Sequence, residues 1–541
     1  MKSKVVLLFI AILSVFLFTA CSNGHSIKNE LNYALNSSPL TADPTLTYDV
    51  NTSVFNAFYC ATLYDYNSDK KLVPGLAESY EVSEDGLTYT FHLRKDLKWS
   101  DGRQLTANDF VYGFKRLADP NVGSNSIYFI TDCCKLKNIF DIQDGEKTLS
   151  ELGVSAPDNN TFIVELEEPC SYFLDLITLK NFAPCNEDFF HSTGNNFGSS
   201  ESNILSSGPY IIDRYEPLAT QIHFKKNPYY YDVDSIKIEG INVQIIADGQ
   251  QALMCYEAGL VDIVSVSGEL LELAESDPEL HIFTSAQLMY LDVNQVSSGP
   301  ELQNINIRKA LTKSIDRQDL TKNLLKSGNE PITRIIPKGF YAETDGTDFA
   351  ENSDRYTEAA GYDKDEAFKY WKQGLSELGI SEISLEFVYS SDSVAIAEAI
   401  ASQMEKTLPG LTVKLKGVPF KERITLENQG KYDLLFTGWS ADYSDPTSFL
   451  ALFLSTGEAV SYSNPEYDSL YSLSCNGEYI NKPDERNKIL HSLEDMIMED
   501  AGTIPIFTSG NTYLIKSYVS GLQTPPTGTG IIVTDLFKKV E

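Results

Sequence analysis

The chain has 541 residues, of which 42% are hydrophobic and 22% are charged, and its formal net charge is −33. One hydrophobic core does not serve a chain of this length, so we expect at least two lobes with large cores. The negative charge argues against nucleic acid or an anionic lipid surface as a partner, because both would be repelled.

The first twenty residues have the pattern of a secretory signal peptide. Two lysines precede an apolar run over 5–18, which is too short for a confident membrane-spanning helix. The run ends in Phe-Thr-Ala-Cys, which resembles a bacterial lipobox with Cys21 as the acylated residue. We therefore expect residues 1–20 to be removed and Cys21 to anchor the protein by a lipid to the outer face of the cell membrane. Cleavage by ordinary signal peptidase is the alternative.

Seven further cysteines follow Cys21, and an odd number cannot all pair within one chain. They are Cys60, Cys133, Cys134, Cys170, Cys185, Cys255 and Cys475. Their spacings match neither a zinc ribbon nor a redox Cys-x-x-Cys pattern. We expect mostly small buried thiols. Cys170 with Cys185 is the first candidate if a pair forms.

The N-terminal half alternates strand and turn signals. Residues 31–35 read as a first strand, and the apolar residues of 87–93 alternate with polar ones as in a half-buried strand. Thr106 with Asp109 three positions later is close to a capping box, which predicts a helix start. Residues 148–185 continue as strand and helix pieces of a small appended subdomain.

The C-terminal half has α/β periodicity. We expect one helix from Ile307 past Arg317 to Leu324, ended by Gly328, on which Asp316 and Arg317 form a salt-bridged face. The later elements are a helix at 363–378, a strand at 385–389, a helix at 394–408, strands at 411–415 and 433–436, a helix around 489–497 and a strand at 503–507. This alternation predicts a largely parallel sheet, whose ligands gather at the carboxyl ends of strands.

The stretch 438–450 combines a strand end, a carboxylate and a helix start. Asp445-Pro446 reads as an N-cap followed by proline at the first helical position, so Asp445 has a structural role. Asp442 has none that the local sequence requires. Placed between Trp439 and Tyr443, its charge would suit a ligand ammonium group. An exposed turn aspartate is the alternative.

This stretch, Gly-Trp-Ser-Ala-Asp-Tyr-Ser-Asp-Pro-Thr-Ser-Phe-Leu, resembles the signature of the family 5 extracellular solute-binding proteins of ABC importers. Further similarity to that family lies at 42–44, 73–80, 85–95, 98–102, 207–210, 225–230, 256–263, 288–294 and 503–507. The resemblance implies an α/β, two-lobed periplasmic-binding-protein-like fold of the large type II class, with an extra subdomain in the N-terminal lobe. Its expected divisions are 1–20 signal peptide; 21–60, 195–290 and 510–541 lobe I; 61–194 appended subdomain; and 291–509 lobe II.

The resemblance also implies a binding site. Asp442 would hold the α-ammonium of a peptide, and the backbone of Gly438, Trp439 and Ser440 would pair with the peptide main chain. The backbone of Tyr48, Asp49 and Val50 would offer the second edge.

The sequence departs from the family pattern in two places. A common Glu-Gly-Leu is replaced by Ala-Thr-Leu at 61–63. The arginine and histidine that meet a ligand carboxylate in tripeptide-capable relatives are replaced by Phe436 and Val394. We therefore expect loose length selectivity, although a lysine or arginine from elsewhere in the cleft could substitute.

We expect a monomeric solute-binding component of an ABC importer that delivers short peptides to permease subunits in the membrane, with no cofactor and no metal. The alternatives are a peptide or pheromone receptor uncoupled from import, and a binder of a nickel complex, haem or an oligosaccharide, because one fold serves several ligands. A secreted hydrolase is disfavoured because the six histidines form no metalloprotease motif and no Gly-x-Ser-x-Gly or phosphate-binding loop occurs.

Overall fold

We describe a computed structural model of the chain. It covers residues 29–39, 41–47, 49–216, 218–326, 328–351, 359–456, 460–475, 479, 482–527 and 530–539. Cys21 and the predicted signal peptide lie outside these residues, as does Tyr48. A search of the covered segments for a helix with the length and hydropathy of a membrane span finds none.

A single mixed sheet runs through both lobes. Its strands in spatial order are β15 (Leu411–Val418), β14 (Ile383–Ser390), β16 (Leu434–Ser440), β12 (Leu280–Val293), β17 (Thr503–Ile515), β11 (Ile263–Ser265), β1 (Glu30–Leu35), β10 (Gly240–Ile245), β9 (Gln221–Lys226) and β8 (Tyr210–Arg214), with β13 (Glu330–Pro331) beside β17. Parallel pairs join β15, β14 and β16, and also β10, β1 and β11. The remaining pairs are antiparallel. The parallel sheet predicted for the second lobe is confirmed for β15, β14 and β16, whereas the crossing strands β12 and β17 pair antiparallel beside them.

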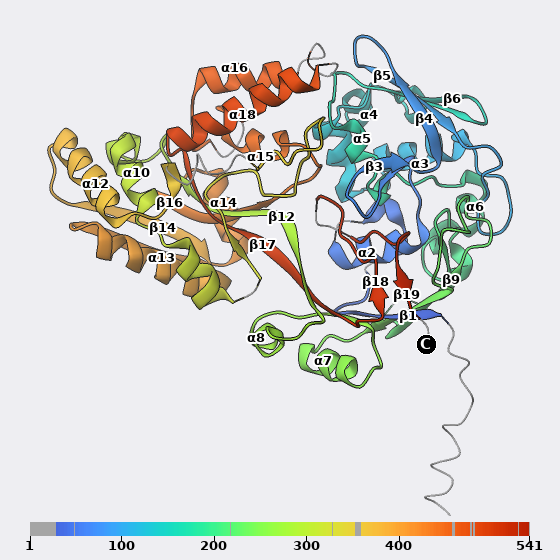
Figure 1. Cartoon of the computed structure of the whole chain (residues 1–541). Coiled ribbons are helices and arrows are strands. Elements are labelled where there is room, and N and C mark those ends of the chain that lie inside the picture. The colour runs from blue at the N-terminus through green and yellow to red at the C-terminus, as the bar shows by residue number, and fades with distance from the viewer. Residues whose placement is uncertain are drawn as a thin grey trace, which may run out of the picture.

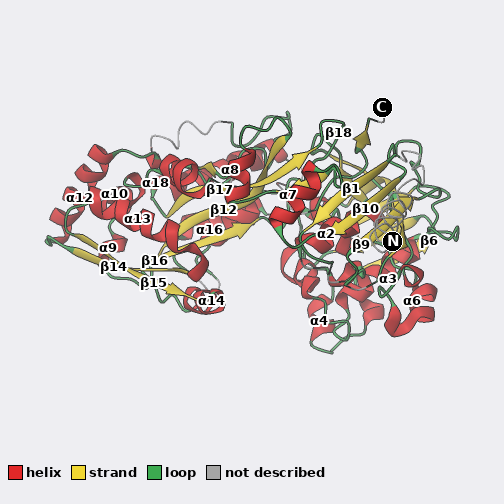
Figure 2. Ribbon diagram, turned by 90° about the horizontal axis from the view of Figure 1, so that it is seen from below, coloured by secondary structure: helices red, strands yellow, loops and turns green. Residues whose placement is uncertain are grey.

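The long strands β12 and β17 connect the lobes (Figures 1 and 2). At one end of β12, Asp292 faces Thr503 of β17, and at the other end Leu280 faces Leu514. The predicted lobe boundaries at 290/291 and 509/510 fall inside these two strands, and the division of the chain by residue stays a prediction. The antiparallel pairs arise because the chain crosses between the lobes along the sheet.

Lobe I carries the appended subdomain above its strands, where α4 and α5 lie near α15 (Thr447–Leu450) and α16 (Pro465–Ser474) (Figure 1). The helices of this half are α2 (Val50–Tyr59), α3 (Ala107–Ala118), α4 (Ile139–Gln143), α5 (Phe173–Leu176), α6 (Glu187–Thr193), α7 (Gly249–Glu257) and α8 (Glu269–Ala274). A second sheet has the order β4 (Ala77–Val82), β5 (Thr88–Leu93), β7 (Thr161–Glu165) and β6 (Val154–Asp158), and short pairs join β2 (Tyr64–Tyr66) to β3 (Leu72–Pro74) and β18 (Val519–Ser520) to β19 (Phe537–Lys538). The capping box at Thr106 and Asp109 and the alternation over 87–93 are confirmed.

Lobe II has helices on both sides of its strands. They are α9 (Pro300–Gln303), α10 (Ile305–Lys313), α12 (Lys364–Leu378), α13 (Val394–Thr407), α14 (Phe420–Asn428), α15 (Thr447–Leu450), α16 (Pro465–Ser474) and α18 (Pro483–Glu499). The predicted helices at 363–378 and 394–408 and the strands leading to 415 and 436 are confirmed within one to four residues. Asp363 caps α12 by accepting hydrogen bonds from two backbone N–H groups, as an N-cap aspartate should.

The predicted single helix over 307–324 is wrong. Helix α10 ends at Lys313, and a separate π-helix covers Asp319–Leu325. The side chain of Arg317 is buried and donates hydrogen bonds to the carbonyls of Pro505 and Ala360. It therefore does not form a salt-bridged surface with Asp316, and these tertiary bonds favour a break in the helix that the local sequence does not indicate.

The seven cysteines after Cys21 are all free thiols in the structure. Cys60, Cys134, Cys170 and Cys185 are buried, as expected of small core residues. The candidate pair of Cys170 and Cys185 is not bonded. Burial raises the pKa of the Cys60 and Cys134 thiols to about 12, so these groups stay protonated at neutral pH.

Candidate functional site

Strand β16 ends with a free edge. Its pairing with β14 stops at Leu435, whereas its pairing with β12 continues to Ser440. Among the described residues, therefore, no strand covers the β14 side of 436–440. Gly438 and Ser440 are exposed there. An unpaired strand edge offers backbone N–H and C=O groups to an added chain.

Gly438 has no side chain, so the backbone at this edge is bare. A Cβ at this position would collide with the thioether of Met289 on β12. The neighbouring Trp439 packs beside the core cluster that includes Phe449 and Leu450. Its indole N–H is buried and has no hydrogen-bond partner. The end of β16 thus presents exposed backbone beside Trp439, whose indole N–H has no hydrogen-bond partner.

Asp442 lies two residues beyond β16 and meets the appended subdomain. Tyr128 donates a hydrogen bond from its hydroxyl to Oδ1 of Asp442 at 2.6 Å, across 314 positions of sequence. The Asp442 backbone N–H is bonded to Oγ of Ser448 at 3.1 Å. Asp442 is thus held by both lobes and is no freely exposed turn residue.

The charge of the Asp442 carboxylate is suited to pairing with a cation. Burial raises the pKa of the Asp442 carboxyl, and the hydrogen bond from Tyr128 opposes that shift only in part. No positively charged side chain contributes to the balance. A partly desolvated carboxylate without a counter-charge is a suitable partner for a ligand ammonium group.

The next residues fix this segment against lobe I. The Tyr443 ring stacks on the Tyr172 ring with centroids 3.6 Å apart and planes within 6°. Tyr443 belongs to the core cluster of lobe I, although it follows a lobe II strand. This contact places Asp442 at a point where the two lobes touch.

Asp445 has the structural role that the sequence indicated. Its carboxylate receives two hydrogen bonds from Arg486, at 2.7 and 2.9 Å, in a buried ion pair. Oδ1 also accepts the Thr447 backbone N–H at the start of α15. Burial alone would raise the pKa of Asp445, but the Arg486 guanidinium outweighs it and holds the pKa below its ordinary value. Asp445 therefore has a positively charged partner in Arg486, whereas Asp442 has none among the described residues.

The second predicted contact lies at the start of α2. Asp49 is extended and caps the helix, since Oδ1 accepts the Thr52 N–H at 2.9 Å. Its other carboxylate oxygen is buried without a hydrogen-bond partner. Val50 is 56% exposed and is the first residue of the helix, where backbone N–H groups lack intrahelical acceptors. Among the described residues, none of the hydrogen bonds or ion pairs of Asp49 joins this segment to 438–442.

Sequence reasoning missed Tyr128, because nothing in its local pattern sets it apart from other aromatic residues of the subdomain. Within the covered segments, no cluster of three or more histidine, cysteine, aspartate or glutamate side chains is placed to hold a metal ion. The chemistry available at this site is hydrogen bonding along a strand edge and ion pairing at one carboxylate.

Comparison with known proteins gives one family. The profile of bacterial extracellular solute-binding proteins, family 5 middle, matches residues 71–461. A dipeptide-binding protein of Lactococcus lactis subsp. cremoris is 30% identical over 538 residues, covering 95% of this chain and 96% of its own.

Two solved structures extend the comparison. Listeria monocytogenes OppA bound to peptide is 32% identical, with a TM-score of 0.68 over 95% of this chain and all of its own. An unliganded, open form of the periplasmic murein tripeptide-binding protein MppA is 25% identical and superposes with a TM-score of 0.83, covering 95% of this chain and 98% of its own.

Proposed function

The chain belongs to the family 5 bacterial extracellular solute-binding proteins, and we propose that it captures short peptides between its lobes and delivers them to the permease of an ABC importer. The observation that carries the proposal is the pairing of a free strand edge with an uncompensated carboxylate. Residues 438–440 offer main-chain groups, and Asp442 lies two residues further on.

The free edge of β16 and the Asp442 carboxylate match two groups that a peptide carries, its main chain and its α-ammonium. An extended main chain can add to the edge of β16 by backbone hydrogen bonds, which tolerate many side chains. An α-ammonium group at one end of that chain can pair with Asp442. An oligosaccharide or haem would use neither feature fully. The relatives from Lactococcus lactis and Listeria monocytogenes are, by their names, binders of a dipeptide and a peptide.

In this proposal the lobe II side binds by Gly438, Trp439 and Ser440 as backbone and by Asp442 as the ammonium partner. The lobe I side contributes the backbone of Tyr48, Asp49 and Val50. Since Val50 begins helix α2, strand-like pairing on this side extends no further than Asp49. The Val50 N–H, at the positive end of the helix, would then meet a ligand carbonyl.

Binding is proposed to close the lobes about β12 and β17. The higher TM-score with the open relative than with the peptide-bound relative supports assigning the present arrangement to an open state. The permease would then recognise the closed form. We further propose that the protein acts as a monomer, held at the outer face of the cell membrane by a lipid on Cys21.

The direct test is native mass spectrometry of the protein purified from its own cells, followed by calorimetry with synthetic versions of any bound molecule. A co-purifying peptide with a free amino terminus is the expected result. A bound oligosaccharide, haem or nickel complex that no peptide displaces would refute the ligand assignment. Unchanged peptide uptake after deletion of the gene would favour a receptor uncoupled from import.

A further inference from the structure

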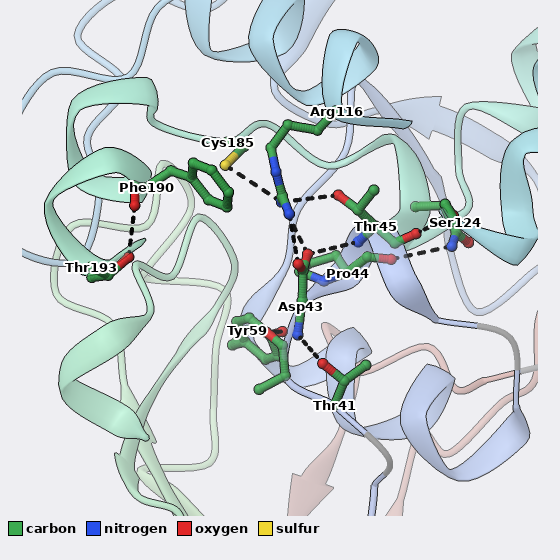
Figure 3. Close-up of polar contacts among 12 residues, drawn as sticks. Thr41, Asp43, Pro44, Thr45, Tyr59, Arg116, Ser124, Cys185, Phe190 and Thr193 are labelled. Carbon is green, nitrogen blue, oxygen red and sulfur yellow. Dashed lines mark hydrogen bonds and ion pairs between the residues drawn. The ribbon is translucent and has the colours of Figure 1, made fainter. Parts of the chain in front are cut away.

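Residues 42–47, the turn before the proposed lobe I contact, are held by buried polar side chains (Figure 3). Arg116 of α3 forms two hydrogen bonds with the Asp43 carboxylate, at 2.7 and 3.0 Å, and a third with Thr45 Oγ1 at 3.1 Å. Its guanidinium lies 4.2 Å from the centroid of the Phe190 ring. Arg116 is 6% exposed and Asp43 is 5% exposed. The ion pair is therefore out of a ligand's reach and fixes one end of the turn.

The other end of the turn is held by one side-chain amide. Nδ2 of Asn181 lies 2.9 Å from the Thr47 carbonyl, 3.1 Å from the Pro44 carbonyl and 3.0 Å from Ser126 Oγ. Ser126 in turn donates to the same Thr47 carbonyl at 2.7 Å. Asn181 is only 8% exposed. This amide thus ties two turns together that lie about eighty positions apart in the sequence.

Each of the two turns leads directly to one part of the proposed site. The first, 42–47, is followed by the start of α2 at Asp49 and Val50. The second is a 3-10 helix over Asn125–Ile127, and the next residue is Tyr128, which donates to Asp442. Asn181 contacts both turns, which are also joined directly by the hydroxyls of Ser124 and Ser126 donating to the Thr45 and Thr47 carbonyls.

We propose that Asn181 is a positioning residue for the lobe I half of the binding site. Its amide sets the start of α2 and the Tyr128 hydroxyl at a fixed separation, so that a ligand meets both without further ordering of the backbone. The ligand class in this inference rests on the proposed function, but the mechanical link between the two turns does not. A preorganised site avoids the entropic cost of fixing these segments at the moment of binding.

The test uses the full chain with Asn181→Asp, which keeps the size of the side chain and replaces the donating group by an oxygen that faces two carbonyls. Hydrogen exchange of the ligand-free protein should become faster in both 49–53 and 124–128. Affinity for a free-amine peptide should fall roughly 5- to 50-fold, as the loss of a buried hydrogen-bond donor implies.

Asn227→Asp is the matched control. Asn227 is a fully buried amide of the same lobe that donates to the Gly208 carbonyl at 2.9 Å. It should lower the unfolding temperature by a comparable amount while leaving exchange in 49–53 and 124–128, and the affinity, close to wild type. A purely structural role for Asn181 would make the two variants behave alike.

The decisive measurement is coupling with Tyr128→Phe. If Asn181 acts through Tyr128 and the start of α2, the double variant should lose less affinity than the product of the two single losses. Independent losses, or faster exchange confined to the immediate neighbours of Asn181, would overturn the inference. Failure of the wild type to bind any peptide would refute the proposed function, and the exchange result would still decide the role of Asn181.

Discussion

Asp442→Asn should weaken peptide binding and at the same time stabilise the ligand-free protein at neutral pH. Both effects follow from a partly buried carboxylate that lacks a cation among the described residues. In the proposed complex it would pair with the ligand ammonium, whereas in the free protein its charge is partly desolvated without compensation. Asparagine keeps the shape and can still accept the hydrogen bond from Tyr128. A gain in stability with a loss of binding is the signature of a ligand-directed charge.

The loss of affinity can be bounded. Removing one partner of a desolvated charge pair costs about 2–5 kcal/mol, which corresponds to roughly 30-fold to several-thousand-fold weaker binding. N-acetylated peptides should already bind the wild type poorly, because they lack the ammonium group. Asp442→Asn should therefore reduce or abolish the difference between free and acetylated peptides.

The pH dependence has a definite sign. Burial raises the pKa of Asp442 above the ordinary value of an aspartate in the free protein, and a bound ammonium would lower it again. Affinity should be constant above the free-state pKa and fall as pH drops through it, starting at a higher pH than for an exposed aspartate. For folding the sign is opposite, since a raised folded-state pKa gives stability that is present at low pH and lost as pH rises through that pKa.

Calorimetry with free and acetylated forms of one peptide, together with thermal unfolding without ligand, tests these points. Asp445→Asn is the matched control, because it breaks the buried pair with Arg486 and should cost about 3–5 kcal/mol of stability. Equal affinity of the wild type for free and acetylated peptides would refute the role of Asp442. So would a lower unfolding temperature for Asp442→Asn than for the wild type.

Three further predictions concern the backbone, the anchor and the ligand carboxylate. N-methylation of ligand amides should reduce affinity sharply by calorimetry, because residues 438–440 are proposed to bind main-chain groups; indifference to methylation would contradict strand addition. Cys21→Ser should release the protein into the medium or leave its precursor uncleaved in cell fractionation, whereas a processed and cell-bound mutant would rule out the lipobox. Amidation of the ligand carboxyl terminus should change affinity little, since Phe436 and Val394 replace the expected cations. A nested series of peptides, free and amidated, checks this, and a sharp length optimum with a large loss on amidation would reveal an unrecognised cation.

Local signals in the sequence identified many of the helices and strands. The capping pattern placed the start of a helix at Thr106, and alternation placed the strand over 87–93. These signals work because each is satisfied within one turn of helix or one strand. The continuity of the sheet across both lobes is not local, and the antiparallel pairs of β12 and β17 were missed for that reason.

The candidate site likewise combines features that the local sequence predicts with features that depend on distant contacts. The sequence indicated that Asp445 is structural and that Asp442 is free for a ligand, and the ion pair with Arg486 supports that distinction. The contact of Tyr128 with Asp442 could not be predicted, since it depends on how two lobes meet across 314 positions. The break near Arg317 was missed because distant carbonyl groups hold its side chain.

The stack of Tyr443 on Tyr172 gives the lobes a second connection, separate from the strands β12 and β17. If both connections persist during the proposed closure, the lobes can turn only about the line that joins them. Points on that axis hardly move, and Asp442, next in the chain to Tyr443, lies close to it. The ammonium end of a peptide would therefore meet the same surroundings at every stage of closure. The far end of the cleft sweeps through the largest arc, and a change in peptide length would be absorbed there as a change in the final angle.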